Sequence, residues 1–363
     1  MTTTNHAHPT PAWVLDVLAE AGLPSAPTAV PLPGRNETWR TERPTQSVVV
    51  KQLVGPNRRQ RFARAAAHTG HRGPLTPTLL HADADRLVLV HSTLADAVTG
   101  SELLVEQTFT TELCRELGAG VADLHLGPLD DVRDVPPPVP SVPSEQAVSA
   151  LPIELVSQFS AGEIQAWRIL QSDPQLPGYL RDLREATAAA PRTPVHGDLR
   201  IDQVLVADGR PYVVDWEEHG AGDPAYDTGS WIGEWVYRAV LDIPTSRGDG
   251  LGTAQPDGVL HHQDLTTAEV VQRGVAKLDA LTPHIVAFWD AYRAVRPVDA
   301  AEIARVTAFA GWHLLDRLLA HAHAASSLPG LHRAAAGIGK RILSNPAGAA
   351  DALGLALTEA GAA

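Results

Sequence analysis

The segment VHGDLRIDQVLV, residues 195–206, leads through the turn sequence ADGRP into YVVDWEEHGAGDPAYD, residues 212–227. Short runs of β-branched residues flank this turn, which predicts an antiparallel β-hairpin with strands over 203–206 and 211–214. Asp198 precedes the first strand and Asp215 follows the second. Both positions lie at the open end of the hairpin, so we expect the two carboxylates to be close together.

Neighbouring carboxylates repel each other unless a cation or a proton compensates their charge. A divalent metal with oxygen ligands is the simplest partner, and magnesium keeps coordination positions open for phosphate oxygens. The pattern therefore predicts a magnesium and nucleotide site beside this hairpin, with Asp202 and Gln203 next to the two carboxylates. A purely structural role for the acids is the competing interpretation, and it would leave several charges clustered without a task.

Composition and charge exclude several classes of protein. The chain has 363 residues and 44% hydrophobic content, which is enough for two lobes with separate cores. A net charge of −13 argues against a nucleic-acid partner. No apolar run reaches the roughly 20 residues that span a bilayer, so we expect no membrane partner. A single cysteine, Cys114, and an N-terminus without a secretory pattern predict a cytoplasmic protein.

The secondary-structure pattern divides the chain near residue 95. Residues 1–95 alternate short β-rich runs with a helical segment over 58–70, which predicts a small sheet with a helix packed on it. Residues 96–363 are mainly helical and carry the catalytic hairpin within 195–227. Two segments, 126–147 and 244–262, are rich in proline or glycine and are predicted to be extended or mobile loops.

The quoted segments resemble the catalytic core of aminoglycoside phosphotransferase-like kinases. In that family a His-Gly-Asp sequence is followed by four residues and an Asn, and later by a metal-binding Asp before Trp-Glu. PGRNETWRTE (33–42) resembles the nucleotide-covering loop, SVVVKQL (47–53) the lysine strand and LVLVHSTL (87–94) the hinge. The resemblance implies an α+β, protein-kinase-like fold with a small β-rich lobe and a larger helical lobe.

The resemblance also implies a phosphotransferase that uses ATP and Mg²⁺. Asp198 would accept the proton of the substrate hydroxyl. Asp215 would bind magnesium, and Lys51 would contact the α- and β-phosphates. His196 and Asp223 would support the catalytic loop by hydrogen bonds.

Further nucleotide contacts are implied at two places in the N-terminal lobe. Gly34 and Asn36 belong to the segment that resembles the nucleotide-covering loop. Backbone groups from His91 to Thr93 would meet the adenine edge at the hinge.

The sequence departs from the family pattern at the metal site. Gln203 stands where the family has a metal-binding Asn. The extra methylene moves the amide oxygen by about 1.5 Å, and magnesium tolerates little deviation from its coordination distances. Either the loop relaxes around Gln203, or Asp202 substitutes for it, or one metal position is lost.

A second departure concerns the partner of Lys51. No Asp or Glu lies between Lys51 and Asp83, and Gln60 or Arg61 occupies the place where the family has an acid. Lys51 must therefore be held by phosphate or by an acid from elsewhere in the chain. The same stretch, NRRQRFAR (57–64), is predicted to be a solvated helix face, with a dock for an acidic ligand as the alternative.

A looser resemblance concerns the acceptor. GDLRIDQ (197–203) and RAAAGIGKRILSNPAGAADALGL (333–355) resemble the stand-alone kinase subunits of class V lanthipeptide synthetases. Those enzymes phosphorylate Ser or Thr of a precursor peptide, and a separate lyase then eliminates the phosphate. The resemblance implies a precursor peptide as substrate and a lyase as a possible partner.

Two alternatives to the peptide stay open. The first is a small-molecule alcohol such as an aminoglycoside, which an acidic chain could attract by its charge. The second is a pseudokinase that binds nucleotide or a partner without turnover. Trp231 and Trp235, four residues apart, are predicted to face the helical core, with a wall of the acceptor pocket as the alternative.

Overall fold

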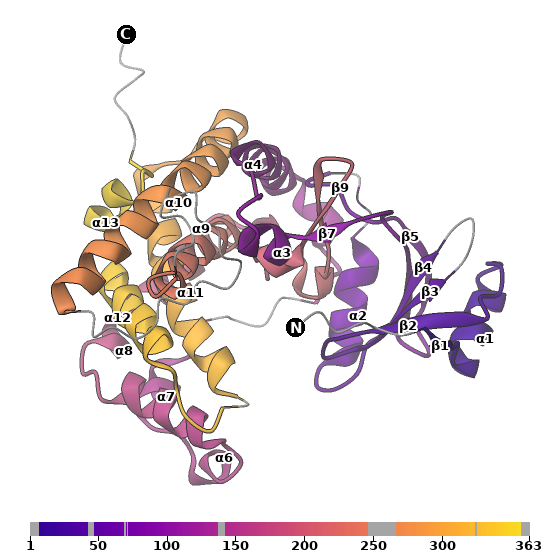
Figure 1. Cartoon of the computed structure of the whole chain (residues 1–363), viewed down its shortest axis with the longest axis horizontal. Helices are drawn as coiled ribbons and strands as arrows, with labels where there is room; N and C mark the ends of the chain where they lie inside the picture. The colour runs from indigo at the N-terminus through magenta and orange to yellow at the C-terminus, as the bar shows by residue number, and fades with distance from the viewer. Residues whose placement is uncertain are drawn as a thin grey trace.

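The computed structural model describes residues 7–42, 47–68, 70, 72–136, 142–245, 266–323 and 325–356. A β-sheet forms the centre of the N-terminal lobe, and a larger lobe of helices follows it (Figure 1). This arrangement confirms the predicted α+β, kinase-like two-lobe fold. Parts of the two predicted loops, residues 137–141 and 246–262, lie outside the described residues.

The N-terminal sheet has six strands in the order β1-β2-β3-β4-β6-β5, and each neighbouring pair is antiparallel. The strands are β1 (His8–Pro9), β2 (Thr28–Leu32), β3 (Glu37–Glu42), β4 (Val48–Gln52), β5 (Leu79–Asp83) and β6 (Val88–Ser92). Helix α1 (Ala12–Glu20) covers the outer face, and helix α2 (Arg58–Ala67) lies between the sheet and the helical lobe (Figure 1).

Strand β4 places Lys51 on the inner face of this sheet. Val48 and Val50 pack with Val14 and Leu18 of α1 in one hydrophobic cluster. Because successive side chains of a strand point to opposite faces, Lys51 points away from α1. It therefore points toward the side on which α2 and the helical lobe lie.

The helical lobe is built around helix α9 (Pro224–Leu241), which is almost wholly buried. The other helices are α3 (Gly100–Val105), α4 (Thr111–His125), α5 (Glu145–Ser149), α6 (Ile153–Val156), α7 (Ala161–Gln171), α8 (Leu176–Ala189), α10 (Thr267–Val295), α11 (Ala300–Ala322), α12 (Gly330–Ser344) and α13 (Pro346–Ala352), with a 3₁₀ turn η1 (Leu129–Val132). Trp231 and Trp235 of α9 lie in the core cluster, which confirms the prediction for both side chains. Within the described residues, no helix has the length and apolar character of a membrane span.

The predicted hairpin forms, one residue away from the predicted strand bounds. Strand β9 (Val204–Ala207) pairs with β10 (Arg210–Val213), and β7 (Val98–Thr99) extends the sheet on the other side of β9. Asp208 and Gly209 both have positive φ values, 50° and 73°, as a two-residue hairpin turn with the favoured twist requires. Strand β8 (Thr193–Val195) pairs with β11 (Gly220–Gly222) and closes residues 196–219 into one loop. We call residues 196–219 the catalytic segment.

Candidate active site

The base of the catalytic segment is fixed by Asp227, a fully buried residue of α9. Its carboxylate accepts the backbone N–H groups of His196 at 2.7 Å and Gly197 at 2.9 Å, and it lies 3.2 Å from Nε2 of His125. Burial alone would raise the pKa of Asp227, but the hydrogen bond and charge of His125 outweigh it and lower the pKa. Asp227 is therefore an ionised anchor for the loop.

The sequence-based expectation gave this anchoring task to Asp223, and the structure corrects it. Asp223 is the N-cap of α9 and accepts the backbone N–H of Ala225 at 3.0 Å. Its second oxygen accepts a hydrogen bond from Arg305 Nε at 2.9 Å. Asp223 thus caps the helix, and Asp227 one turn later reaches the loop, since residues four apart lie on the same face of a helix.

His196 connects the loop that carries Asp198 to the strand end that precedes Asp215. Its Nε2–H donates to the carbonyl of Val214 at 3.0 Å, and its Nδ1 accepts the backbone N–H of Asp198 at 3.2 Å. Burial lowers the pKa of His196, which keeps the ring neutral so that Nδ1 can accept. Both hydrogen bonds of this histidine are to backbone groups, so they are structural.

Asp198 lies in an environment that favours its protonated form. Burial raises the pKa of Asp198 most, and the charges of Asp215 and Asp202 raise it further. Arg200, whose Nε lies 3.1 Å from Asp198 Oδ1, and Arg317 of α11 oppose this effect. The resulting pKa is about 7, which suits a general base that works near neutral pH.

Lys51 and Asp215 join the two lobes by an ion pair, with Nζ and Oδ1 2.6 Å apart. Burial would lower the pKa of Lys51, but the charges of Asp215 and Glu217 raise it. Burial would raise the pKa of Asp215, but the charge of Lys51 and the hydrogen bonds with Glu217 and Lys51 together outweigh it and lower the pKa. Both groups are therefore charged at neutral pH, and the structure brings the predicted lysine and the predicted metal ligand together.

Glu217 is a site residue that the sequence reasoning missed. It stands two residues after Asp215 in the 3₁₀ turn η3 (Trp216–Glu218), and its side chain is 3% exposed. One carboxylate oxygen contacts Lys51 Nζ, so Glu217 is the acid from elsewhere in the chain that the sequence required. The short spacing in DWEE was the available signal, because two acids so close in sequence can both reach one lysine.

The basic stretch on α2 has an unexpected role. Residues 58 and 59 are exposed, as predicted for a solvated face, but Arg61 and Arg64 are each only 2% exposed. Arg61 Nη1 lies 2.7 Å from Glu217 Oε2, and Arg64 Nη1 lies 2.6 Å from Glu218 Oε2. The prediction of a solvated face was therefore wrong for these two arginines, which are internal ion-pair partners.

The residues beside the hairpin can hold a magnesium ion. The backbone N–H of Val214 donates to the carbonyl of Gln203 at 2.9 Å, which sets Gln203 next to Asp215. Gln203 is buried, and its amide forms no side-chain hydrogen bond with the part of the chain that the structure describes. Asp202 instead is 52% exposed and lies beside Arg200. A carboxylate and an amide oxygen are suitable ligands for magnesium, which takes its remaining ligands from phosphate and water.

The described residues contain no group of three or more His, Cys, Asp or Glu side chains that could hold a metal ion by themselves. The oxygen donors that fit magnesium beside the hairpin are those of Asp215 and Gln203.

The turn between β2 and β3 carries Gly34 and Asn36. Gly34 has φ 154°, a value that side-chain-bearing residues rarely adopt. The Asn36 amide is already engaged, because Nδ2 donates to Glu217 Oε1 at 2.5 Å and Oδ1 accepts the backbone N–H of Val54 at 3.2 Å. Asn36 thus ties this turn to the catalytic segment, a task that the sequence did not indicate.

His91 lies near the end of β6, and Thr93 directly follows this strand. The Thr93 hydroxyl donates to the carbonyl of Ser47 at 2.8 Å. Burial lowers the pKa of His91 to about 4, and the charge of Lys51 contributes to the shift. A neutral His91 close to Lys51 is compatible with the predicted hinge, where backbone groups would meet an adenine.

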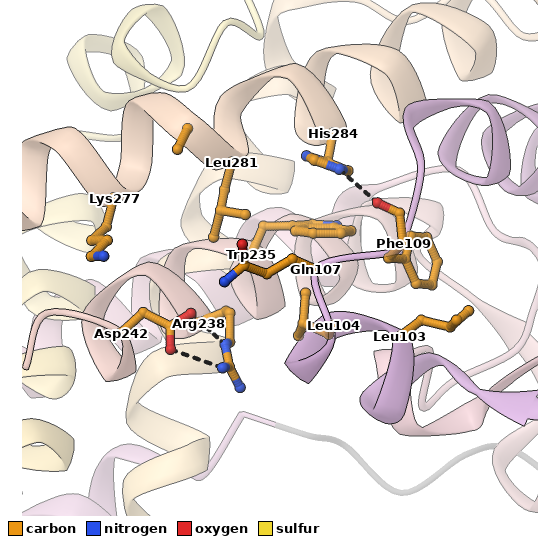
Figure 2. A pocket seen from close by; sticks show the side chains of 11 residues that line it. Leu103, Leu104, Gln107, Phe109, Trp235, Arg238, Asp242, Lys277, Leu281 and His284 are labelled. Carbon is orange, nitrogen blue, oxygen red and sulfur yellow. Dashed lines mark hydrogen bonds and ion pairs between the residues drawn. The ribbon is translucent and has the colours of Figure 1, made fainter. Parts of the chain in front are cut away.

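A cavity of about 150 Å³ lies in the helical lobe between α3, α9 and α10 (Figure 2). Leu103, Leu104, Trp235 and Leu281 give it an apolar lining, and the Arg238–Asp242 ion pair borders one end. None of its lining residues belongs to the catalytic segment. Trp235 therefore lines this cavity and not the surroundings of Asp198.

The two-lobe fold and the lysine–aspartate pair across its lobes define a class of proteins, the kinase-type phosphotransferases that act on hydroxyl groups. Residues 28–258 match the family model described as the phosphotransferase enzyme family. Because this match covers more than half of the chain, the protein belongs to that family. A search of curated proteins finds no match to the sequence.

Solved structures share the fold at low sequence identity. Choline kinase LicA from Streptococcus pneumoniae matches with a TM-score of 0.51 and 13% identity, over 92% of this chain and 100% of that one. LicA in complex with AMP matches with a TM-score of 0.50 and 12% identity, over 92% of this chain and 97% of that one. The AMP-bound spectinomycin phosphotransferase APH(9)-Ia matches with a TM-score of 0.49 and 11% identity, over 89% of this chain and 97% of that one. The two likenesses to LicA support the fold.

Proposed function

We propose that this protein transfers the γ-phosphate of Mg-ATP to an acceptor hydroxyl, with Asp198 as the base. The observation that carries the proposal is the juxtaposition of Asp198, with its pKa of about 7, and the charged pair of Asp215 and Lys51. Three such groups in one place support catalysis more than nucleotide binding alone, because catalytic sites are where buried charges are brought together at a cost in stability.

Each residue has a distinct task in this proposal. Lys51 would orient the nucleotide phosphates, and Asp215 with Gln203 would hold the magnesium ion. When bound, the ion would neutralise charge on the phosphates, which is its usual contribution to phosphoryl transfer. Asp198 would orient the acceptor hydroxyl and take its proton as the phosphoryl group arrives.

We further propose that the acceptor is a Ser or Thr side chain of a ribosomally made precursor peptide, as in lanthipeptide maturation, with a separate lyase to eliminate the phosphate. Besides the resemblance of GDLRIDQ, the charges near the base support this choice. Arg200 and Arg317 both act electrostatically on Asp198. Two guanidinium groups beside the base disfavour a cationic alcohol and suit a peptide, whose backbone carbonyls accept hydrogen bonds from arginine.

A small-molecule alcohol is the second candidate acceptor, because the buried carboxylate of Glu234 lies close enough to Arg200 and Arg317 to interact with their charges. Burial would raise the pKa of Glu234, but the charge and hydrogen bond of His313 and the charge of Arg317 lower it. An ionised Glu234 near Arg200 and Arg317 could bind an amine of an aminoglycoside-type acceptor if the arginines turn away.

A panel of acceptors distinguishes the two candidates. The full chain is incubated with Mg-ATP and with Ser/Thr peptides of acidic, neutral or basic flanks, aminoglycosides or choline, and the products are analysed by mass spectrometry. We expect a phosphate adduct on peptides and a loss of peptide turnover in Arg317→Met, but not in the exposed control Arg341→Met. Adducts confined to the cationic alcohols would refute the peptide proposal, and nucleotide binding without any adduct would favour the pseudokinase.

The rate should also depend on pH in a defined way. Protonated Asp198 cannot accept a proton, so kcat/KM should fall about tenfold for each pH unit below about 7 and level off above it. A pH profile of the initial rate from pH 5 to 9 measures this limb. A flat profile across pH 7, with the nucleotide saturating, would show that Asp198 is not the titrating base.

A further inference from the structure

The carboxylate of Glu217 contacts three cationic side chains and one amide beside the proposed nucleotide site. It contacts Lys51 and Arg61, accepts Asn36 Nδ2 at 2.5 Å, and lies 3.0 Å from Nη2 of Arg35. The side chains of Glu217 and Arg61 are each 3% exposed, and that of Lys51 is 17% exposed. Buried ions of this kind depend on one another, because removing one partner leaves the others without compensation.

Helix α2 presents a cation, Arg61, toward the site, where an acid would be needed to pair with Lys51. Arg61 stands on the face of α2 that meets η3, and its Nη2 also contacts the carbonyl of Val54. A cation at this place cannot attract the ammonium group of Lys51. It can hold Glu217 in place, and Glu217 in turn contacts Lys51 on its other oxygen.

We propose that Glu217 is the positioning residue for Lys51, and that Arg61 acts through Glu217. The acid that aligns the lysine comes from the catalytic segment, and the helix contributes the cation that orients this acid. The inference rests on the proposed contact of Lys51 with the nucleotide phosphates. It adds that Lys51 requires a second acid besides Asp215, whichever element supplies it.

The test moves the acid from the loop to the helix. Four variants of the full chain are compared with the parent: Glu217→Gln, Arg61→Glu with Glu217→Gln, Arg61→Gln with Glu217→Gln, and Glu112→Gln, whose side chain is 78% exposed on α4, as the control. Calorimetry with Mg-ADP gives the nucleotide affinity, and thermal unfolding reports the fold. The two double variants differ only at residue 61, so their comparison holds even if Glu217→Gln alone is unstable.

We expect Glu217→Gln to weaken Mg-ADP binding by on the order of 10- to 100-fold, as for the loss of a hydrogen bond to a charged group. Arg61→Glu with Glu217→Gln should recover most of this loss, because an acid again faces Lys51. Arg61→Gln with Glu217→Gln should not recover it, and the exposed control Glu112→Gln should bind like the parent.

Three results would overturn the inference. Equal affinities of the two double variants would show that Lys51 needs no acid other than Asp215. An unchanged affinity in a folded Glu217→Gln would show the same. Full recovery of Glu217→Gln by excess Mg²⁺ would make Glu217 a metal ligand instead. If the parent chain itself does not bind Mg-ADP, the proposed function fails first, so the two failures are distinguishable.

Discussion

Asp198→Asn is expected to reduce phosphoryl transfer by on the order of 10²- to 10⁴-fold while leaving the affinity for Mg-nucleotide unchanged. Asparagine keeps the shape of the side chain but cannot accept the hydroxyl proton. The Lys51–Asp215 pair, which we assign to the nucleotide, does not involve Asp198. Single-turnover measurements with an acceptor from the panel give the rate, and calorimetry with Mg-ADP gives the affinity.

Stability measurements separate a catalytic effect from misfolding. The pKa of Asp198 rises from 3.8 to about 7 on folding, so its ionised form opposes folding above pH 3.8. The neutral asparagine removes this penalty, and at pH 8 the variant should unfold at the same temperature as the parent or higher. Asp182→Asn on the exposed part of α8 is the matched control. Parent-like turnover in a folded Asp198→Asn would remove the assignment of the base.

Asp215→Asn is expected to weaken the binding of Mg-nucleotide by more than about 10²-fold, because the loss of a direct ligand should exceed the effect of changes in outer contacts. Asparagine is the informative choice because Asp215 has φ 67°, a left-handed conformation that Asn tolerates and Ala does not. The substitution also removes the charge that pairs with Lys51 at 2.6 Å.

Titrations of ADP with and without Mg²⁺ measure this effect. The parent should show a strong dependence on Mg²⁺, and Asp215→Asn should show little. Asp202→Asn is the control, because its side chain is 52% exposed and lies beside Arg200. If Asp202→Asn loses the Mg²⁺ dependence and Asp215→Asn keeps it, the roles of the two acids are exchanged.

Local patterns in the sequence predicted much of the fold. The hairpin at 204–213 follows from β-branched runs around an Asp-Gly turn, and the pattern of strand β4 places Lys51 opposite Val48 and Val50. The juxtaposition of Asp198 and Asp215 also follows from local geometry, because a hairpin brings both of its ends together. These features depend on residues that are near each other in the chain.

Contacts between distant segments could not be predicted in this way. The partners of Glu217 lie 156 or more residues away in sequence, and their pairing depends on how α2 packs on the catalytic segment. Arg61 and Arg64 were predicted to face solvent because arginine usually does. Burial of both became possible because carboxylates from another lobe compensate their charges. The loop anchor Asp227 was missed for a similar reason, since its partners His196, Gly197 and His125 lie 30 or more residues away in sequence.

The ion pairs of α2 have a consequence for any attempt to divide the chain. The predicted boundary near residue 95 separates Arg61 and Arg64 from Glu217 and Glu218. A fragment that ends there would retain the whole six-stranded sheet and yet lose the anions that make burial of its two arginines tolerable. We therefore expect that the N-terminal lobe cannot be exchanged between relatives by itself. The segment after Asp215, which carries Glu217 and Glu218, would have to be exchanged together with that lobe.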